Sequence, residues 1–95
     1  MSDVDEVTSD DANEAPAPTA VAVCEYVVRA VVDDPDAVRV EVDEGGRRLT
    51  LNVYVAPGDM GRVIGKRGRV AQSIRQVVRA AAARDEAEID VEFVD

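Results

Sequence analysis

Residues 63–70 read VIGKRGRV, so two glycines enclose two cations, with an apolar pair before them and a third cation after them. Glycine has no Cβ, so the backbone can turn sharply at Gly65 and Gly68 and approach the backbone of a ligand closely. The following residues have helical periodicity, and a helix N-terminus offers unpaired N–H groups and a partial positive charge. Lys66 and Arg67 add two full charges at the tip of the loop. The stretch therefore predicts a clamp for a phosphate backbone.

Helical periodicity is found on both sides of this loop. Apolar residues predict a helix over 20–34, with Thr19 as its N-cap, and a short helix over 59–64 that Asp59 can cap. The longest helix is predicted over 69–84. Its expected buried stripe is Val70, Ile74, Val77, Val78 and Ala81.

Strict alternation of apolar and polar residues predicts three strands. Two of them, over 37–43 and 49–55, are joined by a tight turn at 44–47, and the third covers 89–94. Each has one face to bury and one to expose to water. Together with the helices they predict an α+β fold of two layers, a three-stranded sheet with helices packed on one face.

The order α-β-β-α-α-β, with VIGKRG between the second and third helices, resembles the type II KH domain of bacteria. At this length the chain is similar to the small bacterial single-KH RNA-binding proteins of the KhpA type, over roughly residues 19–95. The Gly65–Gly68 segment corresponds to the GXXG loop of that family, which clamps about four nucleotides of single-stranded nucleic acid. The resemblance implies an RNA-binding protein, an RNA chaperone or post-transcriptional regulator.

The resemblance also implies which residues contact RNA. The expected backbone and phosphate contacts are Gly65, Lys66, Arg67, Gly68, Arg69 and Arg62. An aliphatic groove for the bases is expected from Val63, Ile64, Val70 and Ile74, with an adjacent strand residue such as Val53 or Val55. Ordinary core packing is the alternative for Ile64, Val70 and Ile74. Many KH domains have Ile three residues after the second glycine, where this chain has Ala71, so a shallower groove is expected.

The charge is unevenly distributed along the chain. The whole chain has a net charge of −9, but residues 1–18 contain six acids and no base. Residues 58–84 carry seven bases against Asp59 alone, a local charge of +6. A local basic surface indicates nucleic-acid binding better than the total charge does. The 1–18 segment is interpreted as a disordered acidic tail, either a solubilising one or an RNA mimic that competes for the basic loop, and 19–95 as the KH domain.

The composition argues against catalysis and against bound cofactors. The chain has no His, and its single cysteine, Cys24, lies on the apolar stripe of the first helix, where a small buried hydrophobe is expected. No nucleophile has an activating neighbour at a readable spacing, so we expect no enzyme, no metal and no cofactor. The segment from Gly61 to Lys66 has only three residues between its glycines, and Arg67 follows the lysine, so it is not a P-loop.

Single-stranded RNA is therefore the expected ligand of a non-catalytic protein. With only three aromatic residues, the chain does not fit folds that stack bases on aromatic platforms. The family resemblance implies a second KH-containing RNA-binding protein as a partner, and a dimer would stabilise so small a core. Without a signal peptide or a membrane span, the expected location is the cytoplasm. The alternative is a KH-fold module for protein–protein contact or dimerisation, with little RNA binding of its own.

Overall fold

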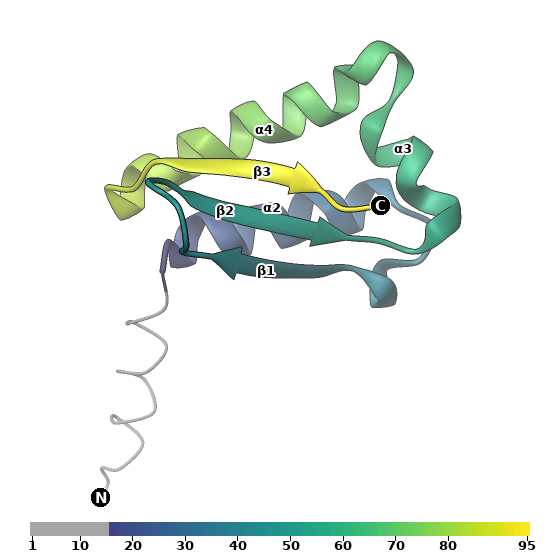
Figure 1. Ribbon diagram of the computed structural model, residues 1–95. Helices are drawn as coiled ribbons and strands as arrows, with labels where there is room; N and C mark the ends of the chain where they lie inside the picture. The colour runs from purple at the N-terminus through teal and green to yellow at the C-terminus, as the bar shows by residue number, and fades with distance from the viewer. Residues whose placement is uncertain (1–15) are drawn as a thin grey trace, which may run out of the picture.

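The computed structural model describes residues 16–95, so residues 1–15 of the predicted acidic tail lie outside the described part (Figure 1). The described chain runs in the order α2 (Pro18–Val31), β1 (Arg39–Asp43), β2 (Leu49–Tyr54), α3 (Met60–Ile64), α4 (Arg69–Ala82) and β3 (Ile89–Phe93). Short 3-10 turns precede β1, α3 and α4 and follow α4. This is the predicted α-β-β-α-α-β order of a type II KH domain.

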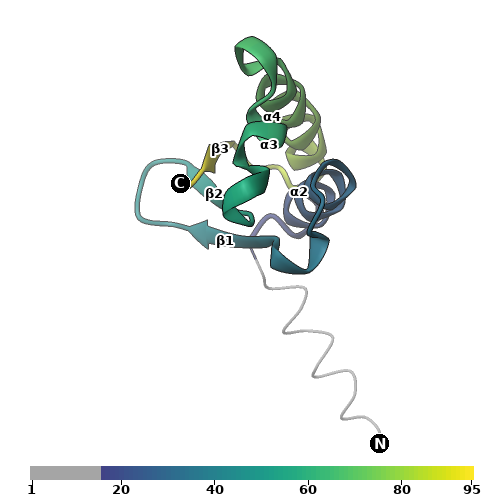
Figure 2. The same cartoon turned by 90° about the vertical axis from the view of Figure 1, so that its right-hand side faces the viewer.

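The three strands form one mixed sheet in the order β1-β2-β3. β1 pairs antiparallel with β2, with Val42 opposite Leu51, and β2 pairs parallel with β3, with Leu51 opposite Val91. The parallel pairing requires a crossover, which α3 and α4 provide. Figures 1 and 2 show α2 and α4 on the same face of the sheet, as predicted, and α3 at the end where β3 terminates.

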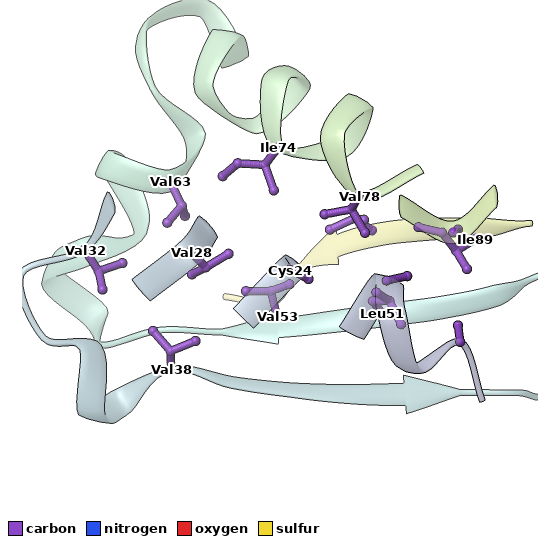
Figure 3. Packing of buried hydrophobic residues seen from close by; sticks show 14 residues of the cluster. Cys24, Val28, Val32, Val38, Leu51, Val53, Val63, Ile74, Val78 and Ile89 are labelled. Carbon is purple, nitrogen blue, oxygen red and sulfur yellow. The ribbon is translucent and has the colours of Figure 1, made fainter. Parts of the chain in front are cut away.

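The core lies between the helices and the sheet. Cys24 and Val28 of α2 meet Leu51 and Val53 of β2 in its centre, while Val78 of α4 closes it from above (Figure 3). All five are fully buried. Burial raises the pKa of the Cys24 thiol to about 12, with a smaller contribution from the charge of Glu25, so the thiol stays protonated as expected for a structural cysteine.

The ends of α2 differ from the prediction. The helix begins at Pro18, so Thr19 lies inside it and is not the N-cap. The Thr19 and Ala20 N–H groups donate instead to the Asp85 carboxylate, at 3.1 and 2.9 Å, from the turn that follows α4. At the other end α2 stops at Val31, three residues early, because the N–H groups of Asp33 and Asp34 donate to Asp59. Both ends of α2 are therefore held by carboxylates distant in sequence.

The buried stripe of α4 is rotated relative to the prediction. The buried residues are Ala71, Ile74, Val78 and Ala82, a spacing of three and four that faces the sheet. Val77 is 47% exposed, and Val70 and Ala81 are half-buried, so these three are not core positions. The prediction for Val77 was therefore wrong, because Ile74 and Val78 occupy the positions of α4 that face the sheet and Val77 lies beside the stripe.

The Asp85 cap predicts a pH-dependent contribution to stability. Partial burial alone would raise the pKa of the Asp85 carboxyl, but hydrogen bonds from Ala20 and from the Thr19 hydroxyl and backbone outweigh it and hold the pKa below its ordinary value. A lowered pKa contributes stability above the unfolded value of about 4, and this contribution is lost as the pH falls through the folded value. Asp85→Asn can accept only one of the two N–H groups, so we expect a loss of about 1 kcal/mol at pH 7.

Urea unfolding at about pH 7 and about pH 3 measures this effect, and the difference between wild type and Asp85→Asn should shrink at the lower pH. Asp95→Asn is the control, since Asp95 makes no hydrogen bond or ion pair to any residue of the 16–95 range. An Asp85→Asn difference that is equal at both pH values would contradict the charged cap.

Candidate nucleic-acid interface

The loop between α3 and α4 is a tight backbone turn. α3 ends at Ile64, and Gly65 follows with φ 76° and ψ 172°, a region essentially limited to glycine. Arg67 and Gly68 are both left-handed, with φ 58° and 73°, and α4 begins at Arg69. The Gly68 N–H donates to the Gly65 carbonyl oxygen at 3.1 Å and closes the turn. Figure 1 shows this loop at the end of the molecule opposite the β1–β2 turn.

The two glycines are required for different reasons. A Cβ on Gly65 would lie 2.4 Å from Val70 Cγ2 and 2.9 Å from the Val70 backbone nitrogen, so the first turn of α4 fills the space that a side chain would need. A Cβ on Gly68 would meet nothing within 4 Å, so that position requires only the left-handed backbone. Gly65 thus sets the contact between the loop and α4, while Gly68 leaves one side of the loop open.

Three cations at the loop have no ion-pair partner among residues 16–95. Lys66, Arg67 and Arg69 are exposed, and none forms an ion pair with any described residue. Arg69 is the first residue of α4, and the N-cap Gly68 has no side chain to satisfy the first N–H groups of the helix. The partial positive charge of the helix N-terminus therefore adds to the side-chain charges at the loop.

Two other basic residues of the 58–84 stretch, Arg75 and Arg79, are engaged within the protein. Arg75 donates from Nε to the Val91 carbonyl oxygen at 3.2 Å and lies over the Phe93 ring, 5.4 Å from its centroid. Arg79 pairs with Asp90 at 3.5 Å. Arg75 was predicted to lie outside the packed face, but its long side chain reaches the outer edge of β3. Arg75 and Arg79 therefore add little to the basic surface at the loop, and Arg84 is exposed in the turn after α4, away from the loop.

Arg62 contacts two carboxylates. Its Nη2 lies 2.8 Å from Asp33 Oδ2, and its Nε lies 3.4 Å from Asp59 Oδ1. Asp59 is only 4% exposed and accepts the Asp33 and Asp34 N–H groups at 3.1 and 3.0 Å. The predicted capping of α3 by Asp59 is therefore wrong, because the carboxylate turns away from its own helix and closes the end of α2.

The predicted base groove divides into buried and accessible residues. Val63 is 0% exposed and Ile74 2%, so both belong to the core in this structure, and Val63 cannot touch a base as predicted. Ile64 and Val70 are half-buried. Of the two strand residues suggested for the groove floor, Val53 is fully buried and Val55 half-buried. Ala71, at the position that is Ile in many KH domains, is buried too.

An apolar groove of about 290 Å³ does border the loop, but between α4 and α2. It is lined by Val27, Val31, Arg69, Val70, Ser73, Ile74 and Val77. The contribution of α2 was not predicted, although Val27 and Val31 follow the helical spacing of that segment. Their proximity to α4 depends on how the two helices pack against the sheet, which the periodicity of one helix does not encode.

Residues 16–95 contain no group of three or more His, Cys, Asp or Glu placed to hold a metal ion. None of the helices in this range is long and apolar enough to span a membrane.

Comparison with known proteins identifies the family. The family described as KhpA/KhpB, KH domain, matches residues 22–93. The chain is 46% identical over 68 residues to the RNA-binding protein KhpA of Caldanaerobacter subterraneus subsp. tengcongensis, covering 72% of this chain and 91% of the relative. It is 43% identical over 75 residues to the RNA-binding protein KhpA of Mycobacterium leprae, covering 79% and 90%. The chain belongs to the KhpA/KhpB KH-domain family.

The KhpA/KhpB match includes the whole loop and leaves the acidic residues 1–18 outside it. Among solved structures, a crystal structure of Aquifex aeolicus Era bound to GDP.AlF4- matches with a TM-score of 0.58 and 16% identity, covering 78% of this chain and 29% of that one. This likeness concerns the fold alone.

The unequal surroundings of the two glycines of this KhpA/KhpB-family loop predict unequal effects of substitution. Gly68→Ala adds only the cost of a left-handed alanine, about 1–2 kcal/mol. Gly65→Ala places alanine in a backbone region that is essentially limited to glycine, and its Cβ would overlap Val70. It should therefore destabilise the fold by a larger amount. Thermal or urea unfolding of the two variants measures the difference, and Gly68→Asn should be milder than Gly68→Ala because Asn tolerates the left-handed region. Equal losses at both positions would contradict the role of the Val70 contact.

Proposed function

We propose that this protein is a non-catalytic binder of single-stranded RNA that holds the RNA backbone with the Gly65–Gly68 loop. The observation that carries the proposal is the set of three exposed cations, Lys66, Arg67 and Arg69, on a glycine-framed loop at an uncapped helix N-terminus. RNA rather than another polyanion is supported by the relatives, which are named RNA-binding protein KhpA. We further propose that it acts in the cytoplasm as an RNA chaperone or post-transcriptional regulator.

The proposed division of roles follows the geometry. The open side of Gly68 admits the sugar–phosphate backbone, and the loop cations neutralise phosphates. Ile64 and Val70 are the half-buried apolar residues nearest the loop and would support bases, whereas Val63 and Ile74 support the loop from the core. Few phosphates are neutralised by one loop, so affinity should be modest and strongly dependent on salt.

Charge reversal at the loop tests this proposal. Lys66→Asp/Arg67→Asp should abolish measurable binding of a labelled single-stranded RNA while the domain stays folded. A loss of two phosphate contacts should also reduce the slope of log K against log salt by about 1.4 in any binding that remains. Fluorescence anisotropy across a salt series measures both quantities, and circular dichroism reports folding.

The matched control is Arg47→Asp/Arg84→Asp. Both arginines are exposed, neither forms an ion pair among the described residues, and they lie in the β1–β2 turn and the turn after α4, at the end of the molecule opposite the loop (Figure 1). This variant has the same net charge as the loop variant, so it should retain most of the affinity. Equal loss in both variants would mean that net charge, and not the loop, determines binding.

A second candidate function is self-association or docking of a second KH-containing protein. It is favoured by Val77, which is 47% exposed beside the apolar groove between α2 and α4. Sedimentation of the loop variant separates the two functions, because loss of RNA binding with unchanged association supports the RNA clamp. Loss of association would instead support a protein-docking role for the loop.

A further inference from the structure

Arg62 differs from the other proposed phosphate contacts because its charge is already neutralised by the protein. It lies on α3, three residues before Gly65, so it is the basic residue that precedes the loop most closely. Its guanidinium contacts Asp33 at 2.8 Å and Asp59 at 3.4 Å. Whether Arg62 is available to RNA therefore depends on another side chain.

The two carboxylates hold the guanidinium in different ways. The Asp59 side chain is 5% exposed and fixed by two backbone N–H groups, so it orients the Nε edge of Arg62. The Asp33 side chain is 73% exposed and has no contact with the 16–95 chain other than Arg62 that would hold it in place. It occupies the outer Nη2 edge and can rotate into solvent without leaving a buried group unpaired. An exposed ion pair of this kind contributes little to stability, so it exchanges readily.

A phosphate oxygen is a natural replacement for the Asp33 carboxylate. Both are anionic acceptors that match the planar fork of donors on a guanidinium. Exchange of one for the other would leave the contact between Nε and Asp59 in place. Arg62 would then meet the phosphate with its orientation already set, whereas the long side chain of an unsupported arginine must be ordered on binding.

We propose that Asp33 is an internal competitor for the phosphate that Arg62 binds, and that it lowers the affinity of the loop for RNA. This inference rests on the proposed function. Arg62 is a conditional contact, occupied by Asp33 in the unbound protein and by RNA phosphate in the complex. Lys66, Arg67 and Arg69 contact RNA without first releasing an ion-pair partner within residues 16–95.

The chain offers a closely matched pair of variants for the test. Asp33 and Asp34 are adjacent, both exposed, and both donate their backbone N–H to Asp59, but only the Asp33 side chain pairs with Arg62. Asp33→Asn and Asp34→Asn each remove one negative charge and keep the backbone hydrogen bonds. We expect Asp33→Asn to bind a labelled single-stranded RNA about two- to five-fold more tightly than Asp34→Asn. Their unfolding midpoints should coincide.

A double-mutant cycle assigns the effect to Arg62. In an Arg62→Gln background, Asp33→Asn and Asp34→Asn should bind with equal affinity, since no guanidinium remains to be released. Equal affinity of the two variants in the wild-type background would overturn the role of Asp33, as would weaker binding by Asp33→Asn. If Lys66→Asp/Arg67→Asp abolishes binding in that same experiment, the proposed RNA-binding function stands even when the role of Asp33 is overturned. If the wild type binds no RNA, both proposals fail.

Discussion

The buried carboxylate of Asp59 connects the end of α2 to the start of α3, and the position of the loop depends on this connection. It sits where α3 begins and closes the C-terminal end of α2 by accepting the Asp33 and Asp34 N–H groups. A half-buried backbone donor without an acceptor is costly, so this contact holds α3 against α2. Asp85 does the same at the other end of α2, beyond the end of α4. The unit formed by α3, the loop and α4 is thus attached to α2 at both ends.

The chemistry of the loop follows from this attachment. Gly65 can lie against Val70 because α3 and α4 are each held in place, and the sharp turn then leaves Lys66 and Arg67 exposed. Other basic side chains of the same region are paired within the unbound protein, with Arg75 on the β3 edge, Arg79 on Asp90 and Arg62 on Asp33 and Asp59. The acidic net charge of the chain is therefore compatible with a small basic interface, because the cations that remain unpaired within residues 16–95 include the three at the loop.

The elements with strong periodic patterns were predicted from the sequence, and those fixed by distant contacts were not. The alternation around Val40 and Leu51 predicted the hairpin, and VIGKRG with its flanking helices predicted the type II KH order. The ends of α2 depend on Asp59 and Asp85, which are 25 or more residues away from their partners, so Thr19 was wrongly assigned as the cap. The face of α4 was misjudged at Val77 because hydrophobicity alone does not distinguish a core position from a groove position. Val63 was assigned to the base groove by family resemblance, and only its burial on the inner face of α3 reveals its role in the core.

In the proposed site, the tightly turned loop binds phosphates and Arg62 beside it exchanges Asp33 for a further phosphate. Titration of an isotopically labelled sample with a short single-stranded RNA, followed by backbone amide NMR shifts, tests this arrangement residue by residue. The account predicts that the largest shifts fall on Gly65 to Ala71, with smaller ones at Arg62 and Asp33, and that the outer face of the sheet is unchanged. Shifts concentrated on the open face of β1 and β2, or confined to the groove around Val27 and Val77, would contradict it.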